Sequence, residues 1–202
     1  MIAIVDYGVG NLFSLKSSFR EIGCEAVVTS DKKILKEADR IVLPGVGAFP
    51  DAMDKLKENG LDITVKEIAE SGRPLLGICL GMQLLFEKGY EFRECDGLRL
   101  IPGEVRPISE VIPADLKIPE IGWNALKFKK RSALYKYINE GDFVYFVHSF
   151  YGRCTDNSVT AVTEYGADLT ASVEKGNVYG TQFHPEKSGQ VGLNILKAFC
   201  EI

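Results

Sequence analysis

One of the five cysteines in the chain, Cys79, stands where nucleophilic chemistry is feasible. It lies between Gly77 and Gly81, where a short apolar segment predicted to be a strand turns directly into a predicted helix. This is the layout of a nucleophile elbow, with cysteine in the place of serine. The helix N-terminus favours the thiolate, and the N–H of Leu80 would point at an oxyanion on a bound carbonyl. Alone, the segment also suits a small buried cysteine that only packs.

A cysteine nucleophile needs an imidazole as its base, and the chain has only two histidines. His184 follows an apolar strand pattern that Pro185 ends, and Glu186 lies two residues on. Residues two apart in an extended segment project to the same side, so Glu186 can reach the imidazole and stabilise the imidazolium. A surface histidine paired with a nearby glutamate would show the same spacing. His148 lies inside an apolar strand pattern, where we expect a core or pocket-wall role.

A third candidate is the segment Pro44-Gly45-Val46-Gly47, directly after a predicted strand. Glycine backbone at a strand end can offer N–H groups to an anion or a developing oxyanion. The segment fits neither the Walker pattern nor the dinucleotide fingerprint, and glycine loops after strands are common. Its meaning therefore depends on what lies beside it.

Composition and charge exclude several classes of protein. The 202 residues fit one domain, residues 1–202, and a net charge of -4 shows no basic excess for binding nucleic acid. Five cysteines without C-x-x-C spacing argue against a disulfide framework and a zinc site, so we expect no metal and no other cofactor. Because there is no secretory signal and no membrane-length apolar run, we expect a cytoplasmic protein.

The elements that must position these residues predict an α/β fold. Strand and helix patterns alternate in the first half, which indicates a mainly parallel sheet flanked by helices. Strand patterns dominate the second half, which indicates added antiparallel strands. The predicted strands are 2–5, 26–29, 40–43, 74–79, 105–108, 125–128, 143–151, 158–164, 169–173 and 178–183; the predicted helices are 12–22 (with Asn11 as N-cap), 49–59, 62–71, 80–87 and 191–200.

Taken together and in this order, the glycine segment, the Cys79 elbow and His184-Pro185-Glu186 resemble the class I glutamine amidotransferases. Within that class the chain is most similar to the glutaminase subunits of imidazole glycerol phosphate synthase, of histidine biosynthesis. The narrower resemblance rests on the segments 6–11, 44–49, 77–83, 122–124, 145–149 and 180–188. The chain departs from these subunits in the stretch 118–121 and at Phe150, where tyrosine is common.

The resemblance implies that Cys79 attacks the side-chain amide of glutamine and forms a glutamyl thioester. His184 then serves as acid and base, and Glu186 orients it. The oxyanion would be held by the Leu80 N–H and by one from Gly45, Val46 or Gly47. The residues implied around the substrate are Gln83, His148, Ser149 and Phe150.

The resemblance also implies a partner that uses the ammonia, because the chain has no second domain to do so. That partner would be a cyclase subunit of barrel fold, which makes imidazole glycerol phosphate and an aminoimidazole carboxamide ribotide. We expect the contact face to include Asn11, Trp123, Asn124 and Lys187.

Three other functions share parts of this pattern. A glutaminase subunit serving another synthase would use the same chemistry, and the Asp-Tyr-Gly and Gly-Trp-Asn segments are what disfavour it. A catalytically silent regulatory module on the same fold would be expected to have lost the Cys, His and Glu set. A cysteine peptidase would be expected to carry an insertion that binds an extended substrate.

Overall fold

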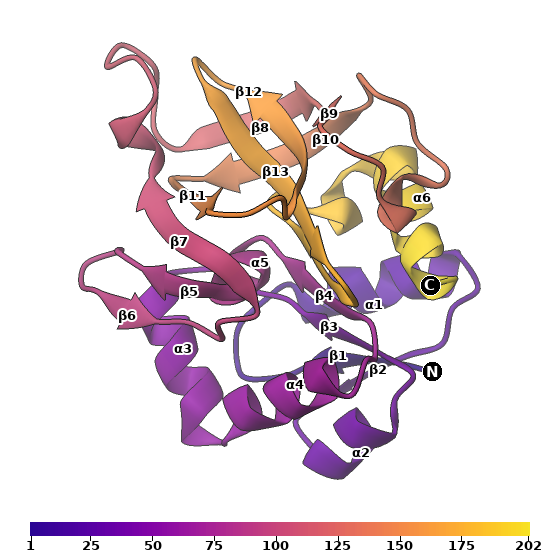
Figure 1. The fold of residues 1–202 in the computed structure, drawn as a ribbon. Helices are drawn as coiled ribbons and strands as arrows, with labels where there is room; N and C mark the ends of the chain where they lie inside the picture. Colours follow the sequence, from indigo (N-terminus) through magenta and orange to yellow (C-terminus); the bar gives the residue numbers. More distant parts are fainter.

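The computed structural model describes residues 1–202 and is built around an eight-stranded sheet in the order β2-β1-β3-β4-β14-β13-β12-β9 (Figure 1). Five neighbouring strands run parallel: β2 (Ala26–Thr29), β1 (Ile2–Val5), β3 (Arg40–Leu43), β4 (Leu75–Ile78) and β14 (Val178–Thr181). The sheet continues antiparallel through β13 (Asp168–Lys175), β12 (Val159–Glu164) and β9 (Lys127–Phe128). The predicted α/β class, a mainly parallel sheet with added antiparallel strands, is confirmed.

Helices bury both faces of this sheet because its strands alternate their side chains between two cores. In β1, Ala3 and Val5 join a core of 27 buried residues, whereas Ile2 and Ile4 join a second core of 21. The first core is covered by α2 (Lys32–Glu37), α3 (Phe49–Glu58) and α4 (Leu61–Glu70), and the second by α1 (Leu12–Glu21) and α6 (Gly189–Cys200). None of the helices combines the length and apolarity that a membrane span requires.

Two smaller sheets lie beside the main one. One pairs β8 (Glu120–Ala125) with β10 (Phe143–His148), and the other has the order β11-β7-β5-β6, made of residues Phe150–Cys154, Ile101–Pro107, Phe86–Gly89 and Cys95–Asp96. The predicted single strand 143–151 is therefore wrong, because Ser149 alone separates two strands that belong to different sheets. Three short 3-10 turns, Ile108–Glu110, Ala133–Tyr135 and Pro185–Lys187, complete the chain.

The helix predicted over 80–87 ends earlier than its pattern suggests. Helix α5 covers only Leu80–Leu84, because Phe86 enters β5 and pairs in parallel with Ile101 of β7. The helix α2 was not predicted at all, and the predicted strand 125–128 is replaced by the end of β8 and by β9. For the helix over 80–87 and the strand over 125–128, pairing with a distant strand, which local patterns do not report, decides the outcome.

Glycine is required where α5 meets the end of β3. A Cβ on Gly81 would lie 1.9 Å from the Leu43 carbonyl oxygen, and one on Gly77 would lie 2.7 Å from the Gly81 carbonyl oxygen. A Cβ on Gly45 would lie 2.7 Å from the Gly81 nitrogen, so the glycine segment packs directly on the start of the helix. Backbone atoms therefore pack against the turn between β4 and α5 at all three glycines.

We expect Gly81→Ala to lower the free energy of unfolding by more than about 3 kcal/mol, because the added methyl meets backbone that cannot yield. Urea denaturation measures the loss. The matched control is Gly176→Ala, whose φ of +59° is left-handed but whose Cβ meets nothing within 4 Å, so only strain of about 1 to 2 kcal/mol is expected. Equal losses in the two variants would contradict the close packing.

Candidate active site

Cys79 occupies a strained turn at the carboxyl end of β4. Its φ of 54° and ψ of -115° are rare for a residue with a side chain. The turn is held by the Cys79 N–H, which donates to the Thr181 carbonyl of the neighbouring β14 at 2.7 Å. Leu80 begins α5, so its N–H has no acceptor one turn earlier in the helix. The elbow geometry predicted from the sequence is present.

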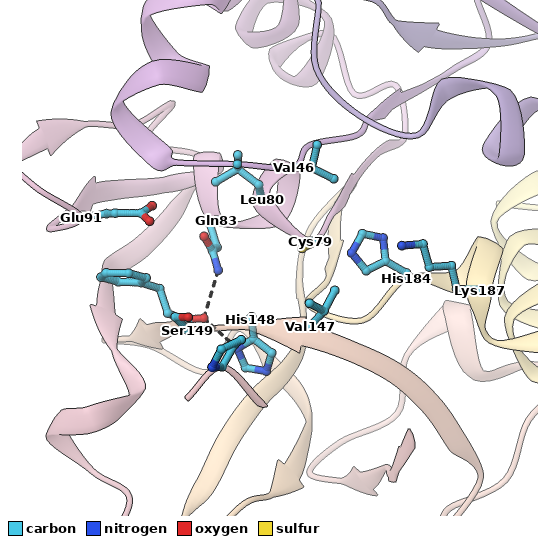
Figure 2. A pocket seen from close by; sticks show the side chains of 13 residues that line it. Val46, Cys79, Leu80, Gln83, Glu91, Val147, His148, Ser149, His184 and Lys187 are labelled. Carbon is cyan, nitrogen blue, oxygen red and sulfur yellow. Dashed lines mark hydrogen bonds between the residues drawn. The ribbon is translucent and has the colours of Figure 1, made fainter. Parts of the chain in front are cut away.

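His184 follows β14, the strand that pairs in parallel with β4, and so lies at the same sheet edge as Cys79. Its Nδ1–H donates to Glu186 Oε1 at 2.8 Å, and both side chains are buried. The predicted contact between His184 and Glu186 is confirmed. The other ring nitrogen, Nε2, is buried without a hydrogen-bond partner, and His184 lines the same cavity as Cys79 (Figure 2).

The charges of the three side chains support one another. Burial by itself lowers the pKa of His184, but the Cys79 sulfur and the Glu186 carboxylate outweigh burial and raise this pKa to about 10. An imidazolium beside the sulfur stabilises a thiolate, which is the reactive form of cysteine. Helix α5 has only five residues, so its dipole is weaker than that of the predicted longer helix.

Strand β10 anchors the turn that carries His184. The His184 N–H donates to the Tyr145 carbonyl at 3.0 Å, and the Tyr145 N–H donates to Ser188 Oγ at 3.0 Å. The hydroxyl of Ser188 in turn donates to the His184 carbonyl at 2.7 Å. The imidazole is thus fixed to β10 from both sides of the turn. Ser188 is not among the site residues predicted from the sequence, because its role depends on β10, about 40 residues earlier in the chain.

The glycine segment is held against the elbow by Tyr7, which the sequence analysis did not single out as a site residue. The buried Tyr7 hydroxyl donates to the Pro44 carbonyl at 2.7 Å. Burial raises the pKa of Tyr7 far above its ordinary value, so the hydroxyl stays protonated and keeps donating. Gly45 is buried behind the cavity, whereas Val46 and Gly47 are exposed and line it.

A cavity of about 350 Å³ opens beside Cys79, which is within the size range of small-molecule sites. Of the residues predicted to hold the oxyanion or to surround the substrate, all except Gly45 line this cavity. The lining residues are Val46, Gly47, Cys79, Leu80, Gln83, Glu91, Pro119, Val147, His148, Ser149, Phe150, His184 and Lys187. The prediction of a pocket-wall position for His148 is confirmed.

A buried amide pair connects this cavity wall to the nucleophile. Gln83 Nε2 donates to the Phe150 carbonyl at 3.0 Å and to Gln182 Oε1 at 2.9 Å. Gln182 Nε2 lies 3.8 Å from Cys79 Sγ. Gln83 is among the residues predicted from the sequence and Gln182 is not, because an amide at the end of an apolar strand carries no chemical motif.

The structure also places a carboxylate on the wall that the sequence analysis missed. Glu91 lines the cavity, and its Oε2 accepts the Phe49 N–H at 2.8 Å. Burial raises the pKa of Glu91, although the bond from Phe49 works in the opposite direction. Figure 2 shows this carboxylate beyond Gln83 on the side away from His184.

The residues predicted to contact a partner separate into two kinds. Trp123 is 54% exposed, its ring meets that of Tyr145 edge to face at 6.2 Å, and Lys187 Nζ lies 5.7 Å from the Tyr145 ring centre. Trp123 and Lys187 therefore flank one aromatic side chain near the cavity. The Asn124 amide instead donates to Glu120 and to the Glu164 carbonyl. Asn11 is the N-cap residue of α1, but the expected side-chain cap bond is absent.

We expect the ring of His184 to titrate near pH 10, against 6.5 for an ordinary histidine, and to titrate lower in Glu186→Gln. Removing the carboxylate removes a cause that raises this pKa and leaves the burial that lowers it. The sign implies that the His184 contribution to stability is complete below pH 6.5 and is lost as pH rises through 10. Because the chain has two histidines, nitrogen NMR resolves each ring. An unchanged titration in Glu186→Gln would contradict the pairing.

Comparison with known proteins agrees with this geometry. The family described as "Glutamine amidotransferase class-I" matches residues 3–201. A relative from Bacillus cereus, named imidazole glycerol phosphate synthase subunit HisH, is 51% identical over 98% of this chain and 93% of its own length. A relative of the same name from Bacillus thuringiensis is 50% identical over the same shares of the two chains.

Solved structures show the same fold at lower sequence identity. A structure titled glutamine amidotransferase has a TM-score of 0.77 at 21% identity and covers 100% of this chain and 98% of its own. PurLQS from Thermotoga maritima has a TM-score of 0.75 at 19% identity. The match covers 99% of this chain and 97% of the PurLQS chain. Family match, close relatives and fold agree, and the chain belongs to the class I glutamine amidotransferases.

Proposed function

We propose that the chain is the glutaminase subunit of an imidazole glycerol phosphate synthase and supplies ammonia for histidine biosynthesis in the cytoplasm. The observation that carries this proposal is the buried set of Cys79, His184 and Glu186 at one edge of the sheet, beside a cavity of about 350 Å³. The relatives that are 50% or 51% identical over nearly the whole chain support the choice of synthase.

In the first half of the reaction, the Cys79 thiolate attacks the side-chain amide carbon of glutamine. The tetrahedral oxyanion forms beside the Leu80 N–H and the Gly45–Gly47 backbone, whose donors stabilise the negative charge. The His184 imidazolium gives its Nε2 proton to the departing nitrogen, and the C–N bond breaks to release ammonia. A glutamyl thioester and a neutral imidazole remain.

In the second half, water replaces ammonia. His184 Nε2 takes a proton from the water as its oxygen attacks the thioester carbon, and the C–S bond breaks to release glutamate. Glu186 keeps the other ring proton on Nδ1 throughout, so Nε2 always faces the reacting atoms. The thiolate and the imidazolium are restored for the next cycle.

The far end of the cavity suits the charged end of glutamine. The Glu91 carboxylate can pair with the α-ammonium group, which hydrolysis leaves unchanged. A substrate held at Glu91 and at Cys79 would span the cavity past Gln83. The chemistry therefore selects a free amino acid over an amide within a protein chain, whose nitrogen carries no charge.

The product indicates a second protein. Ammonia is mostly protonated at neutral pH and is then a poor nucleophile, so a glutaminase that feeds a synthase has to pass it on before it reaches solvent. We infer that a cyclase subunit of barrel fold covers the face around Trp123 and Lys187, with Asn11 and Asn124 near its edges. The exposed aromatic Trp123 is the type of residue that dominates binding energies at interfaces.

We expect Cys79→Ala to abolish ammonia release from glutamine in the presence of the cyclase, with a loss of at least about 10⁴-fold. The matched control is Cys154→Ala, since this thiol lies outside the cavity and burial raises its pKa to about 12. The measurement is coupled detection of glutamate. Ammonia release by Cys79→Ala at the wild-type rate would remove the basis of the proposed function.

We expect Lys187→Glu to weaken binding of the cyclase by about tenfold or more, because the variant removes a cation beside Tyr145 and the exposed Trp123. Titration of the chain against immobilised cyclase measures the affinity directly and does not depend on enzyme turnover. Lys197→Glu is the matched control, because Lys197 Nζ also lies over a tyrosine ring, that of Tyr137, at 4.9 Å. Full-strength binding by Lys187→Glu would place the partner on a different face.

A further inference from the structure

A buried ionisable pair that the proposed mechanism does not use joins His148, in the wall of the cavity, to Glu120 behind it. Glu120 begins β8 and His148 ends β10, and the two are directly opposite in the antiparallel pairing. They are 3% and 6% exposed, and Glu120 Oε2 lies 3.0 Å from His148 Nε2. A buried carboxylate lowers the stability of the fold unless its hydrogen-bond partners replace the water it has lost. We therefore expect this pair to serve a function.

The hydrogen bonds of His148 fix how many protons the pair carries. Nδ1 lies 2.8 Å from the Phe150 carbonyl, which can only accept, so Nδ1 carries a proton. The contact between Nε2 and Glu120 then requires one more proton, on the ring or on the carboxyl group. The ring is therefore bound at both nitrogens and cannot rotate without losing a buried bond.

The pair also has an anchor on its other side. Asn124 Nδ2 donates to Glu120 Oε1 at 3.1 Å and to the Glu164 carbonyl at 2.8 Å. This amide ties the carboxylate to the end of β12, a strand of the main sheet. Glu120 is thus placed by contacts independent of His148 and can hold His148 in turn.

Two donors converge on the part of the wall that His148 supports. The Phe150 carbonyl accepts from both His148 Nδ1 and Gln83 Nε2, as Figure 2 shows by the two dashed lines. The preceding carbonyl, of Ser149, accepts the Ile108 N–H at 3.0 Å. The carbonyls of Ser149, which connects β10 to β11, and of Phe150, which begins β11, are thereby both occupied by donors of the protein. These contacts set the orientation of this wall.

We propose that Glu120 is a positioning residue for glutamine, which acts by holding His148 and, through it, the Ser149–Phe150 wall in the orientation that binds substrate. This inference rests on the glutaminase activity proposed above. It assigns Glu120 to substrate binding and leaves the chemical steps to the Cys79 set.

Two substitutions separate hydrogen bonding from mere space filling. In Glu120→Gln, the amide oxygen can accept from Asn124 and the amide N–H can donate to His148 Nε2, while Nδ1–H still donates to Phe150. In Glu120→Met, a side chain of similar length offers neither bond. The first variant therefore preserves the network with a neutral group, and the second breaks it.

With the cyclase present, we expect Glu120→Met to raise the Michaelis constant for glutamine by about tenfold or more, with a much smaller change in kcat. Glu120→Gln should keep both constants close to wild type. Calorimetric binding of glutamine in a Cys79→Ala background should show the same order of affinities, free of any effect on chemistry. Alkylation of Cys79 by iodoacetamide should proceed alike in both variants, which verifies that each has folded around its nucleophile.

A double substitution tests whether Glu120 acts through His148. In a His148→Leu background, Glu120→Met should add little further loss of glutamine affinity, because the contact it removes is already gone. If the fold-losses of glutamine affinity caused by Glu120→Met and His148→Leu multiply in the double variant, the two residues act independently and the proposal is overturned. An unchanged Michaelis constant in Glu120→Met, or equal impairment of Glu120→Gln and Glu120→Met, would overturn it as well.

Failure of the proposed function would look different. In that case wild type, Glu120→Gln and Glu120→Met would all release no ammonia from glutamine and bind none, although iodoacetamide still alkylated Cys79. Such a result would show that glutamine is not the substrate, and the inference about Glu120 would fall with the proposed function. If instead the wild type releases ammonia from glutamine and Glu120→Met does so equally well, the proposed function stands and only the role of Glu120 is wrong.

Discussion

The close approach of α5 to the end of β3 is the constraint on which the other features of the site depend. Gly81 packs so tightly on the Leu43 carbonyl that the helix must begin directly at the end of β4. Cys79 is thereby forced into a left-handed conformation, with its side chain at the sheet edge. The same contact brings the Gly45 backbone against the helix start, so nucleophile and anion-binding backbone are set by one packing arrangement.

The two histidines of the chain show how hydrogen bonding separates a reacting group from a supporting one. Both are buried and both contact a glutamate. Glu186 binds Nδ1 of His184 and leaves Nε2 open, whereas His148 is bound at both nitrogens. A ring with an open nitrogen can exchange a proton with substrate, and a ring closed at both can only hold its neighbours in place. Their chemistry therefore differs although their residue type and burial do not.

The sequence predicted those parts of the site whose spacing is local. The sequence predicts Cys79 between its glycines, and the pair of His184 and Glu186, because the geometry of each depends on only a few neighbouring residues. Gln182 and Glu120 are not predicted, because they matter only through contacts with residues far away in the chain, Gln83 and His148. The overlong helix over 80–87 has the same cause: pairing of β5 with β7 outweighs the local helical pattern. The alternation of strands and helices, in contrast, was sufficient for the fold class.

The pairing of β14 with β4 has a consequence for how the protein is made. Val178–Thr181 lies beside Leu75–Ile78, so the strand that delivers His184 is synthesised long after the one that delivers Cys79. Domains emerge from the ribosome N-terminus first, and contacts between distant segments form late. A growing chain therefore carries the thiol without its base. The order of the strands along the polypeptide keeps the nucleophile without its base during translation, until the segment that carries His184 has been made.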